Sequence, residues 1–359
     1  MSLNKRLFTG EPAPPPAPDQ ATSTPSGKSN FNIAIYNGNW NYNSATQTIT
    51  VGFRPDIIWL KGIGNTDAHH QYDSNRGIGM PIYPSETNNE VGYAGGHMDT
   101  TSTGFTLKTD NMNFHTNTYV AWCWKVGNGA SSNTNGSITA QVQVNSNVEC
   151  SVITYTGNGS TSATVGHGLS GTPDVVVVKD RQAAGAWNSI HTNIAANKSI
   201  PWHSNAAASS SMGNNGSITR NQLTSTVFGF QTGAVGVGSV NTSGRNYLAF
   251  AFKSKTGKSH FGSYSGTGSS GKQITGLGFE PDLLILKREN GTGNWIMIDS
   301  QRDTTDIRTA ALFLDTQSAQ SESAEYGVNL DSDGFTITGT NSSINASGGN
   351  YIYYAWKIN

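Results

Sequence analysis

A proline-aspartate pair followed by four apolar residues and a lysine occurs three times in this chain of 359 residues. The three stretches read FRPDIIWLKG (53–62), GTPDVVVVKD (171–180) and FEPDLLILKR (279–288). Matches at this many positions are typical of an internal repeat, and a repeat constrains the architecture more than any single motif does. The sequence therefore predicts several copies of one folding unit.

Two further anchors recur around this stretch in the same order. A tyrosine with a glycine turn precedes it, and an aromatic segment ending in lysine follows it (YVAWCWK, YLAFAFK and YIYYAWK). From the first tyrosine to the aspartate the gaps are 20, 19 and 18 residues, and from the aspartate to the closing tyrosine they are 63, 73 and 69. The predicted organisation is an arm (1–29), repeat 1 (30–126), a linker (127–147), repeat 2 (148–255) and repeat 3 (256–359).

The apolar runs are short, rich in Val, Ile, Tyr and Trp, and bounded by Gly, Asn and Ser. This pattern predicts strands joined by turns, and the 42 glycines disfavour long helices. We expect an all-β chain of three tandem, homologous β-sandwich-like domains, with a jelly roll as one possible topology. In each Pro-Asp stretch, proline should start the turn, aspartate should bind amides of that turn, and lysine should emerge into solvent.

Composition excludes several classes of partner. The formal net charge is −1 and charged residues make up 13% of the chain, so no field attracts nucleic acid. The longest apolar run is about six residues, YVAWCW, which predicts no membrane insertion. No cleavable signal is evident in MSLNKRLF, and Cys123 and Cys150 are expected to be buried free thiols.

The arm combines a short basic and apolar peptide with a proline-rich spacer. Five prolines between positions 12 and 18 favour an extended polyproline II conformation. We expect the peptide ahead of them to be an attachment segment held by a neighbouring subunit through Leu3, Lys5, Arg6, Leu7 and Phe8.

Several segments resemble catalytic or metal-binding motifs but lack necessary parts. GTGSSGKQ (266–273) has the glycines and lysine of a phosphate-binding loop, yet a strand pattern follows it instead of a helix. DSDGF (331–335) lacks the third acidic position and the closing glutamate of an EF-hand, which leaves only a loose calcium site open. The histidines do not have metal-ligand spacing. We therefore expect no cofactor, no metal and no enzymatic activity.

One constellation admits a functional interpretation. His69, Trp187 and Trp295 each come eight residues after the repeat lysine, and Asp299 follows Trp295 by four. Exposed tryptophans beside such polar groups can stack on a sugar ring and bind its hydroxyls, so these residues and Trp202 are candidate surface-glycan contacts. The alternative is that these tryptophans are buried.

Taken together, the order of Y-x-G-x-G, the Pro-Asp stretch, W-x₃-D with a nearby arginine, Gly-Phe and YVAWxWK resembles an uncharacterised repeat domain. That domain is common in virion proteins of marine and freshwater bacteriophages, and MSLNKRLF is similar to the N-terminus of many of them. Repeat 2 departs from the pattern, with His191 at the aspartate position and YLAFAFK in place of the tryptophans. The resemblance implies a structural protein of a phage particle.

Three hypotheses follow for the function. The first is a tail fibre or adhesin that docks on tail or capsid proteins through its arm and presents three β domains to a host surface glycan. The second is a capsid decoration or capsid-fibre protein that docks in the same way and recognises nothing. The third is a polysaccharide hydrolase using Asp73, Asp299 or Asp303. We expect the protein in the virion, assembled in the host cytoplasm. That the three copies form a pseudo-threefold knob is a hypothesis that the sequence leaves open, as it does homo-oligomerisation.

Overall fold

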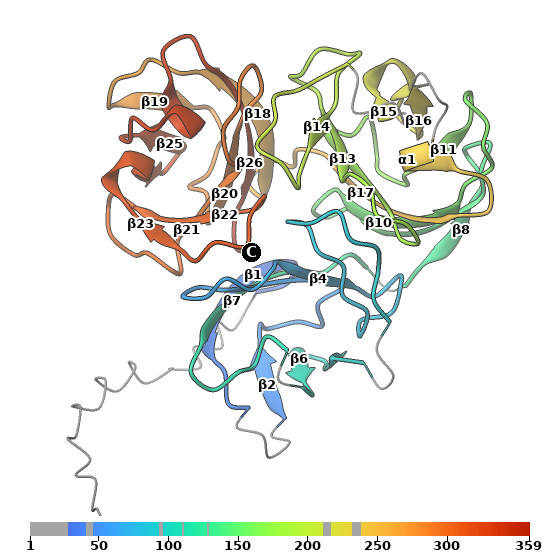
Figure 1. Ribbon diagram of the computed structural model, residues 1–359, viewed down its shortest axis with the longest axis horizontal. Coiled ribbons are helices and arrows are strands. Elements are labelled where there is room, and N and C mark those ends of the chain that lie inside the picture. The colour runs from blue at the N-terminus through green and yellow to red at the C-terminus, as the bar shows by residue number, and fades with distance from the viewer. Residues whose placement is uncertain are drawn as a thin grey trace, which may run out of the picture.

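The computed structural model describes residues 28–40, 46–92, 96–109, 111–127, 129–210, 217–231 and 238–359. Its regular structure is almost entirely antiparallel β-sheet, which confirms the predicted all-β fold of three tandem sandwiches. Figure 1 shows the three repeats as three lobes around a common centre, with the C-terminus close to that centre. No helix among the described residues is long and apolar enough to cross a membrane.

Repeat 1 sets the pattern for the other two. Its larger sheet has the order β1-β7-β3-β4, and its smaller sheet has the order β2-β6-β5. Its strands are β1 (Phe31–Asn37), β2 (Gln47–Thr50), β3 (Ile57–Gly62), β4 (His70–Asp73), β5 (Met98–Thr100), β6 (Gly104–Leu107) and β7 (Thr118–Trp124). The closing aromatic segment is thus the strand β7, which lies between the first strand and the Pro-Asp strand.

Repeat 2 has the same order, β10-β17-β12-β13 and β11-β16-β15, with further strands at both edges of the larger sheet. Its elements are β10 (Cys150–Thr156), β11 (Thr164–Gly166), β12 (Val175–Asp180), β13 (Asn188–His191), β14 (Ile200–Pro201), β15 (Ser217–Thr219), η1 (Arg220–Gln222), β16 (Val227–Gln231), α1 (Gly238–Asn241) and β17 (Asn246–Phe252).

The predicted linker is part of repeat 2. Strand β9 (Ala140–Asn145) pairs with β10 from Ala140 to Asn145, and β8 (Ser131–Asn133) pairs with β9. Two segments of the predicted linker, 131–133 and 140–145, thus lie in the larger sheet of repeat 2, and the alternation of apolar and polar residues in AQVQVN favours such a strand.

Repeat 3 has the orders β18-β26-β20-β21-β22-β23 and β19-β25-β24. Its elements are β18 (Ser259–Ser265), β19 (Lys272–Thr275), β20 (Leu283–Arg288), β21 (Ile296–Asp299), β22 (Ala310–Phe313), β23 (Ser321–Glu322), η2 (Ala324–Tyr326), β24 (Val328–Asp331), β25 (Gly334–Ile337), α2 (Ser342–Asn345) and β26 (Asn350–Trp356). The sequence left the topology of each sandwich open, and the structure shows that all three repeats share one strand order in four strands of the larger sheet and in the smaller sheet.

Two stacked tyrosines hold the loop before the closing strand in each repeat. The ring centroids of Tyr36 and Tyr119 are 5.3 Å apart, and the equivalent pairs are 5.1 and 4.9 Å apart. The Tyr36 hydroxyl donates to the carbonyl of Met112 at 2.8 Å, and the Tyr119 hydroxyl accepts from the amide of Phe114 at 3.1 Å. The same bonds recur in repeats 2 and 3, which explains why both tyrosines belong to the repeat pattern.

The aspartate of each Pro-Asp pair binds chain segments outside its own turn. Asp282 accepts from the amide of Ile358, just beyond β26, at 2.8 Å and from the hydroxyl of Ser300, just beyond β21, at 2.7 Å. Asp56 and Asp174 accept equivalent bonds. The expected role within the turn is therefore corrected: this carboxylate joins three neighbouring strands at one end of the sheet.

A shared core lies where the three lobes meet. Each lobe has an apolar core between its two sheets, and a fourth cluster contains side chains from all three repeats. Seven of the eight tryptophans belong to this cluster, the central aromatic core: Trp59, Trp122, Trp124, Trp187, Trp202, Trp295 and Trp356. The repeats therefore form one body.

Replacing Asp282 with alanine should destabilise the protein by about 2 kcal/mol, because the amide of Ile358 loses its acceptor. Denaturant unfolding of the full chain measures this change. Asp306→Ala, at an exposed position, is the matched control and should leave the midpoint unchanged. Equal midpoints for both variants would contradict the structural role of Asp282.

Candidate functional site

Trp202 occupies the centre of the aromatic core. Its ring stacks on Trp59 of repeat 1, with centroids 5.7 Å apart and planes at 18°, and on Trp187 of its own repeat at 6.0 Å and 15°. It meets Trp295 of repeat 3 edge-on, at 6.4 Å and 69°. Offset-stacked and edge-to-face rings are the favoured geometries for such contacts, so one side chain of repeat 2 packs against both neighbours.

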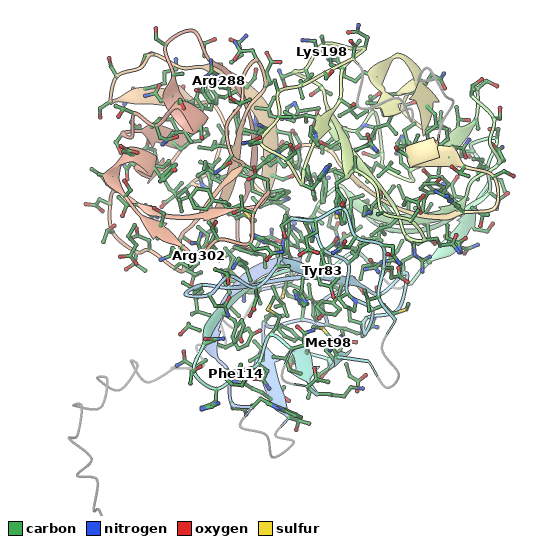
Figure 2. All side chains as sticks on the ribbon, in the orientation of Figure 1. Tyr83, Met98, Phe114, Lys198, Arg288 and Arg302 are labelled. Carbon is green, nitrogen blue, oxygen red and sulfur yellow. The ribbon has the colours of Figure 1, made fainter. Side chains whose placement is uncertain are left out.

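Three loops each leave one repeat and bind the next; we call them the crossing loops, and they span residues 83–90, 201–208 and 313–320. The indole Nε1 of Trp187 in repeat 2 donates to the carbonyl of Tyr83 in repeat 1 at 2.9 Å. Trp295 in repeat 3 donates likewise to the carbonyl of Pro201 in repeat 2 at 2.8 Å. Figure 2 shows Tyr83 close to the junction of the lobes.

His69 takes the place of these tryptophans at the third junction. Its Nε2 donates to the carbonyl of Phe313 in repeat 3 at 3.0 Å, while its Nδ1 accepts from Trp59 Nε1 at 3.0 Å. Burial lowers the pKa of His69 well below its ordinary value, so the ring is neutral. The two partners assign the proton to Nε2.

The main chain of the crossing loops closes a ring of the three repeats. The amide of one loop residue donates to a carbonyl of the following repeat at each junction: Glu90 to Arg181 at 2.9 Å, Ala208 to Glu289 at 2.8 Å, and Gln320 to Ile63 at 2.8 Å. The third bond returns from repeat 3 to repeat 1. The arrangement is a closed pseudo-threefold ring built from one chain.

The three repeat lysines are buried in this ring. Lys287 Nζ donates to the carbonyl of Asn205 on a crossing loop at 2.9 Å and to that of Gly293 at 2.6 Å. Lys179 makes equivalent bonds, whereas Lys61 binds two carbonyls of its own repeat. All three have no exposed surface, and burial lowers the pKa of each to about 8. The prediction that these lysines reach solvent was wrong. A crossing loop of the preceding repeat binds Lys179 and Lys287, and Lys61 is buried against carbonyls of its own repeat.

Asp299 is part of the same junctions. Its carboxylate forms an ion pair with Arg302 at 2.6 Å and accepts from Trp122 Nε1 of repeat 1 at 3.2 Å. Asp73 and Arg76 form the equivalent ion pair at 2.6 Å. Figure 2 shows Arg302 near the junction of the lobes.

His191, which replaces aspartate in repeat 2, stacks on Tyr354 of repeat 3 with centroids 5.5 Å apart. Burial lowers the pKa of His191 to about 3, so this side chain is neutral. Repeat 2 thus has an aromatic stacking contact where repeats 1 and 3 have a buried ion pair. The three repeats close into a ring with both kinds of contact.

The candidate glycan contacts do not reach the surface. The exposed fractions of five side chains are 4% or less: His69, Trp187, Trp202, Trp295 and Asp299. A stacking platform for a sugar needs an open aromatic face, so the structure removes these residues as surface-glycan contacts. His69, Trp187 and Trp295 recur eight residues after the lysine because each donates to a carbonyl of another repeat at its junction. The five candidate attachment residues Leu3, Lys5, Arg6, Leu7 and Phe8 lie outside the described residues.

The three carboxylates considered for hydrolysis are held by other groups. Asp73 and Asp299 form buried ion pairs. Partial burial alone would raise the pKa of Asp303, but hydrogen bonds from Thr305, Thr309 and Ala310 lower it. A general acid needs the opposite shift, so Asp303 is not suited to that role.

The segments that resembled ligand loops have structural roles. Lys272 begins strand β19, where a phosphate-binding loop requires a helix. Asp333 accepts from the amides of Gly276 and Gly278, and Asp331 accepts from the hydroxyl of Thr336. No group of three potential metal ligands is found among the described residues. Both cysteine thiols are buried and free, and burial raises their pKa.

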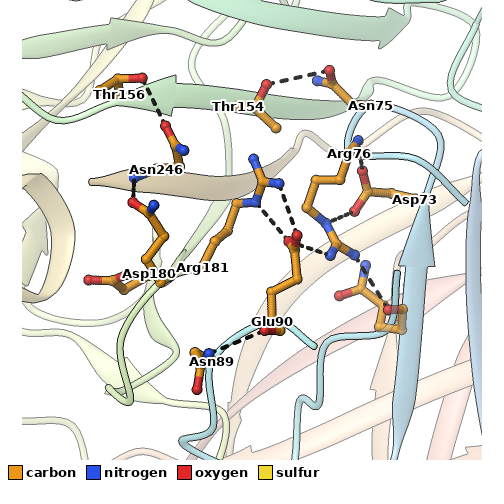
Figure 3. Close-up of polar contacts among 12 residues, drawn as sticks. Asp73, Asn75, Arg76, Asn89, Glu90, Thr154, Thr156, Asp180, Arg181 and Asn246 are labelled. Carbon is orange, nitrogen blue, oxygen red and sulfur yellow. Dashed lines mark hydrogen bonds and ion pairs between the residues drawn. The ribbon is translucent and has the colours of Figure 1, made fainter. Parts of the chain in front are cut away.

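An open polar pocket lies at the junction of repeats 1 and 2. Glu90 lies between two guanidinium groups, accepting from Arg76 at 2.9 Å and from Arg181 at 2.7 and 3.0 Å (Figure 3). Burial alone would raise the pKa of Glu90, but Arg181 and Arg76 hold it below its ordinary value. The pocket above them has a volume of about 440 Å³ and is also lined by Gln182 and Asn246.

Sequence reasoning missed this pocket for a physical reason. Glu90 and Arg181 come from different repeats, and the equivalent positions carry Ala208 with Glu289 and Gln320 with Ile63. A site that occurs at only one of three equivalent junctions leaves no repeated pattern in the sequence. The one sequence feature that could have indicated the pocket is the charge of Glu90, where the equivalent positions carry Ala208 and Gln320.

The fold and junctions define an all-β protein whose three repeats form one pseudo-threefold knob. The model of the family described as "Domain of unknown function (DUF7483)" matches residues 26–358, and the chain belongs to that family. The family unit therefore spans all three repeats. No curated protein and no solved structure matches the chain.

Replacing Lys287 with methionine should change how stability depends on pH. Folded Lys287 releases its proton near pH 8, whereas the unfolded side chain keeps it to a pH near its ordinary pKa of 10.5. The unfolded state then binds more protons in this window, so wild-type stability should rise relative to Lys287→Met by about 1 kcal/mol per pH unit. Denaturant unfolding at several pH values measures the difference. Identical slopes in the two proteins would contradict the burial of a titrating amine.

Replacing Glu90 with alanine should cost about 3 kcal/mol, because two guanidinium groups lose their shared carboxylate. Gln320→Ala is the matched control at the equivalent junction, where Gln320 accepts one bond from Arg302, and it should cost about 1 kcal/mol. Thermal unfolding of both variants gives the comparison. A Glu90→Ala protein no less stable than Gln320→Ala would exclude a stabilising role for this ion network.

Proposed function

We propose that the protein is a structural component of a bacteriophage virion, of the tail fibre or adhesin type. The arm, residues 1–29, docks on tail or capsid proteins, and the knob faces the host surface. The protein acts by binding and has no catalytic role. The resemblance of its repeats to those of phage virion proteins underlies this proposal.

The observation that carries the proposal is a closed threefold knob in which Ser29 and Asn30 lie beside the centre. The amide of Ser29 donates to the carbonyl of Asn359 at 2.6 Å, and Asn30 Nδ2 donates to Asn359 Oδ1 at 2.9 Å. The C-terminus lies near the centre of the three lobes (Figure 1). The first described residues of the chain, Ser29 and Asn30, therefore lie beside the point that the three lobes share. The geometry suits a terminal knob, and one chain supplies the threefold form that trimeric fibres obtain from three.

The capsid-decoration alternative has a specific observation in its favour. The aromatic side chains expected to contact host glycan are buried, as a protein without a receptor would allow. However, Val91 and Ile307 are the large apolar side chains that the described residues expose, at 38% and 50%. A cementing protein buries large apolar surfaces on its partner, and these two scattered side chains do not provide one.

Binding to separated heads and tails tests the proposal. Full-length protein should bind one of the two fractions, and protein lacking residues 1–11 should not, because the anchor has been removed. The bound fraction then distinguishes a tail fibre from a capsid fibre. Equal binding by both proteins would assign the contact to the knob and favour a decoration protein. Binding of neither protein to heads or tails would contradict a virion role.

A further inference from the structure

Among the described residues, the junction of repeats 1 and 2 is the one at which a carboxylate is shared by guanidinium groups of two repeats. Glu90 and Arg181 line the pocket, with 8% and 20% of their side-chain surface exposed, and the second partner of Glu90, Arg76, is buried behind them. The pocket's volume of about 440 Å³ is in the range of small-molecule sites. Three amide side chains line its walls: Asn89, Gln182 and Asn246.

Each of these amides is held at one end by the protein. Gln182 Oε1 accepts from the backbone amide of Asn246 at 2.7 Å, and Asn246 Oδ1 accepts from the hydroxyl of Thr156 at 3.0 Å. Asn89 Nδ2 donates to the carbonyl of Glu90 at 3.2 Å. The opposite ends, two NH₂ groups and one carbonyl oxygen, have no hydrogen-bond partner among the described residues. Figure 3 shows Asn246 with its anchoring contacts on the far side of Arg181 from Arg76.

This arrangement fixes donors and an acceptor before any ligand arrives. A side chain oriented in advance loses less conformational entropy on binding, so its hydrogen bonds contribute more to affinity. Hydroxyl groups both donate and accept, and they match such a mixed set better than a purely donating or purely accepting ligand does.

The charges around the pocket are already balanced. They form carboxylate-guanidinium pairs: Asp73 with Arg76, Glu90 with Arg76 and Arg181, and Asp180 with Arg245. Three carboxylates face three guanidinium groups, so an ionic ligand would find no uncompensated counter-charge. A neutral ligand is favoured.

We propose that this pocket binds a neutral saccharide segment, with Gln182 and Asn246 donating to its hydroxyls and Asn89 accepting from one. The inference rests on the proposed function, since it names the surface chemistry that the knob recognises. The proposed recognition site is therefore this polar pocket and not the buried tryptophans. The pocket forms only when repeats 1 and 2 pack together, because both repeats line it.

Calorimetric titration of the full-length protein tests this inference. The probes are the neutral disaccharides maltose, cellobiose, lactose and diacetylchitobiose, each to about 10 mM, with digalacturonic acid as the anionic comparison. At least one neutral probe should bind, and Gln182→Ala should weaken it about tenfold through the loss of one directed donor. Asn290→Ala is the matched control. Asn290 accepts from the amide of Asn350 as Gln182 accepts from the amide of Asn246, but it lies outside the pocket that Glu90 and Arg181 line. This control should leave affinity unchanged.

Three results would overturn the inference: no neutral probe binds, digalacturonic acid binds more tightly, or Gln182→Ala and Asn290→Ala bind alike. Thermal unfolding of both variants establishes that they remain folded. Binding of Gln182→Ala to heads and tails separates the two proposals. If the wild-type protein binds particles but no saccharide, the pocket proposal alone fails. If the wild-type protein binds neither heads nor tails, the virion role itself is contradicted.

Discussion

The knob depends on hydrogen bonds that cross between repeats around a shared aromatic core. The carbonyls of Tyr83, Pro201 and Phe313 lie against the neighbouring repeat, and the bonds that Pro201 and Phe313 accept there are buried. A buried carbonyl without a donor costs about 1–3 kcal/mol, so each junction must supply one. The ring nitrogens of two tryptophans and a histidine do so, and the amine groups of two buried lysines satisfy further loop carbonyls.

The ring is threefold in its main chain but not in its side chains. Equivalent amides of Glu90, Ala208 and Gln320 make the same backbone bond at every junction. The side chains at these positions are charged, apolar and amide-bearing, and only Glu90 joins two arginines across repeats. Backbone bonds therefore set the common architecture, while the side chains leave one junction free to carry a distinct site.

Much of the fold could be predicted from sequence because its signals are local and repeated. The Pro-Asp strand, the tyrosine anchors and the closing aromatic strand were all identified in this way. What could not be predicted depends on contacts between repeats. The run before Lys179 shows a buried strand, but nothing local shows that the next residue is covered by a loop from repeat 1. The same limit applies to the tryptophans proposed for glycan binding and to Glu90, whose partner Arg181 lies in another repeat.

Hydrogen exchange of the Gln320 amide is the most direct test of ring closure. This amide donates to Ile63 in repeat 1 and so joins the last repeat to the first. In the closed ring it should exchange as slowly as the equivalent amides of Glu90 and Ala208. Rapid exchange of Gln320, with protection retained at the other two, would show repeats arranged in a row and would contradict the closed knob.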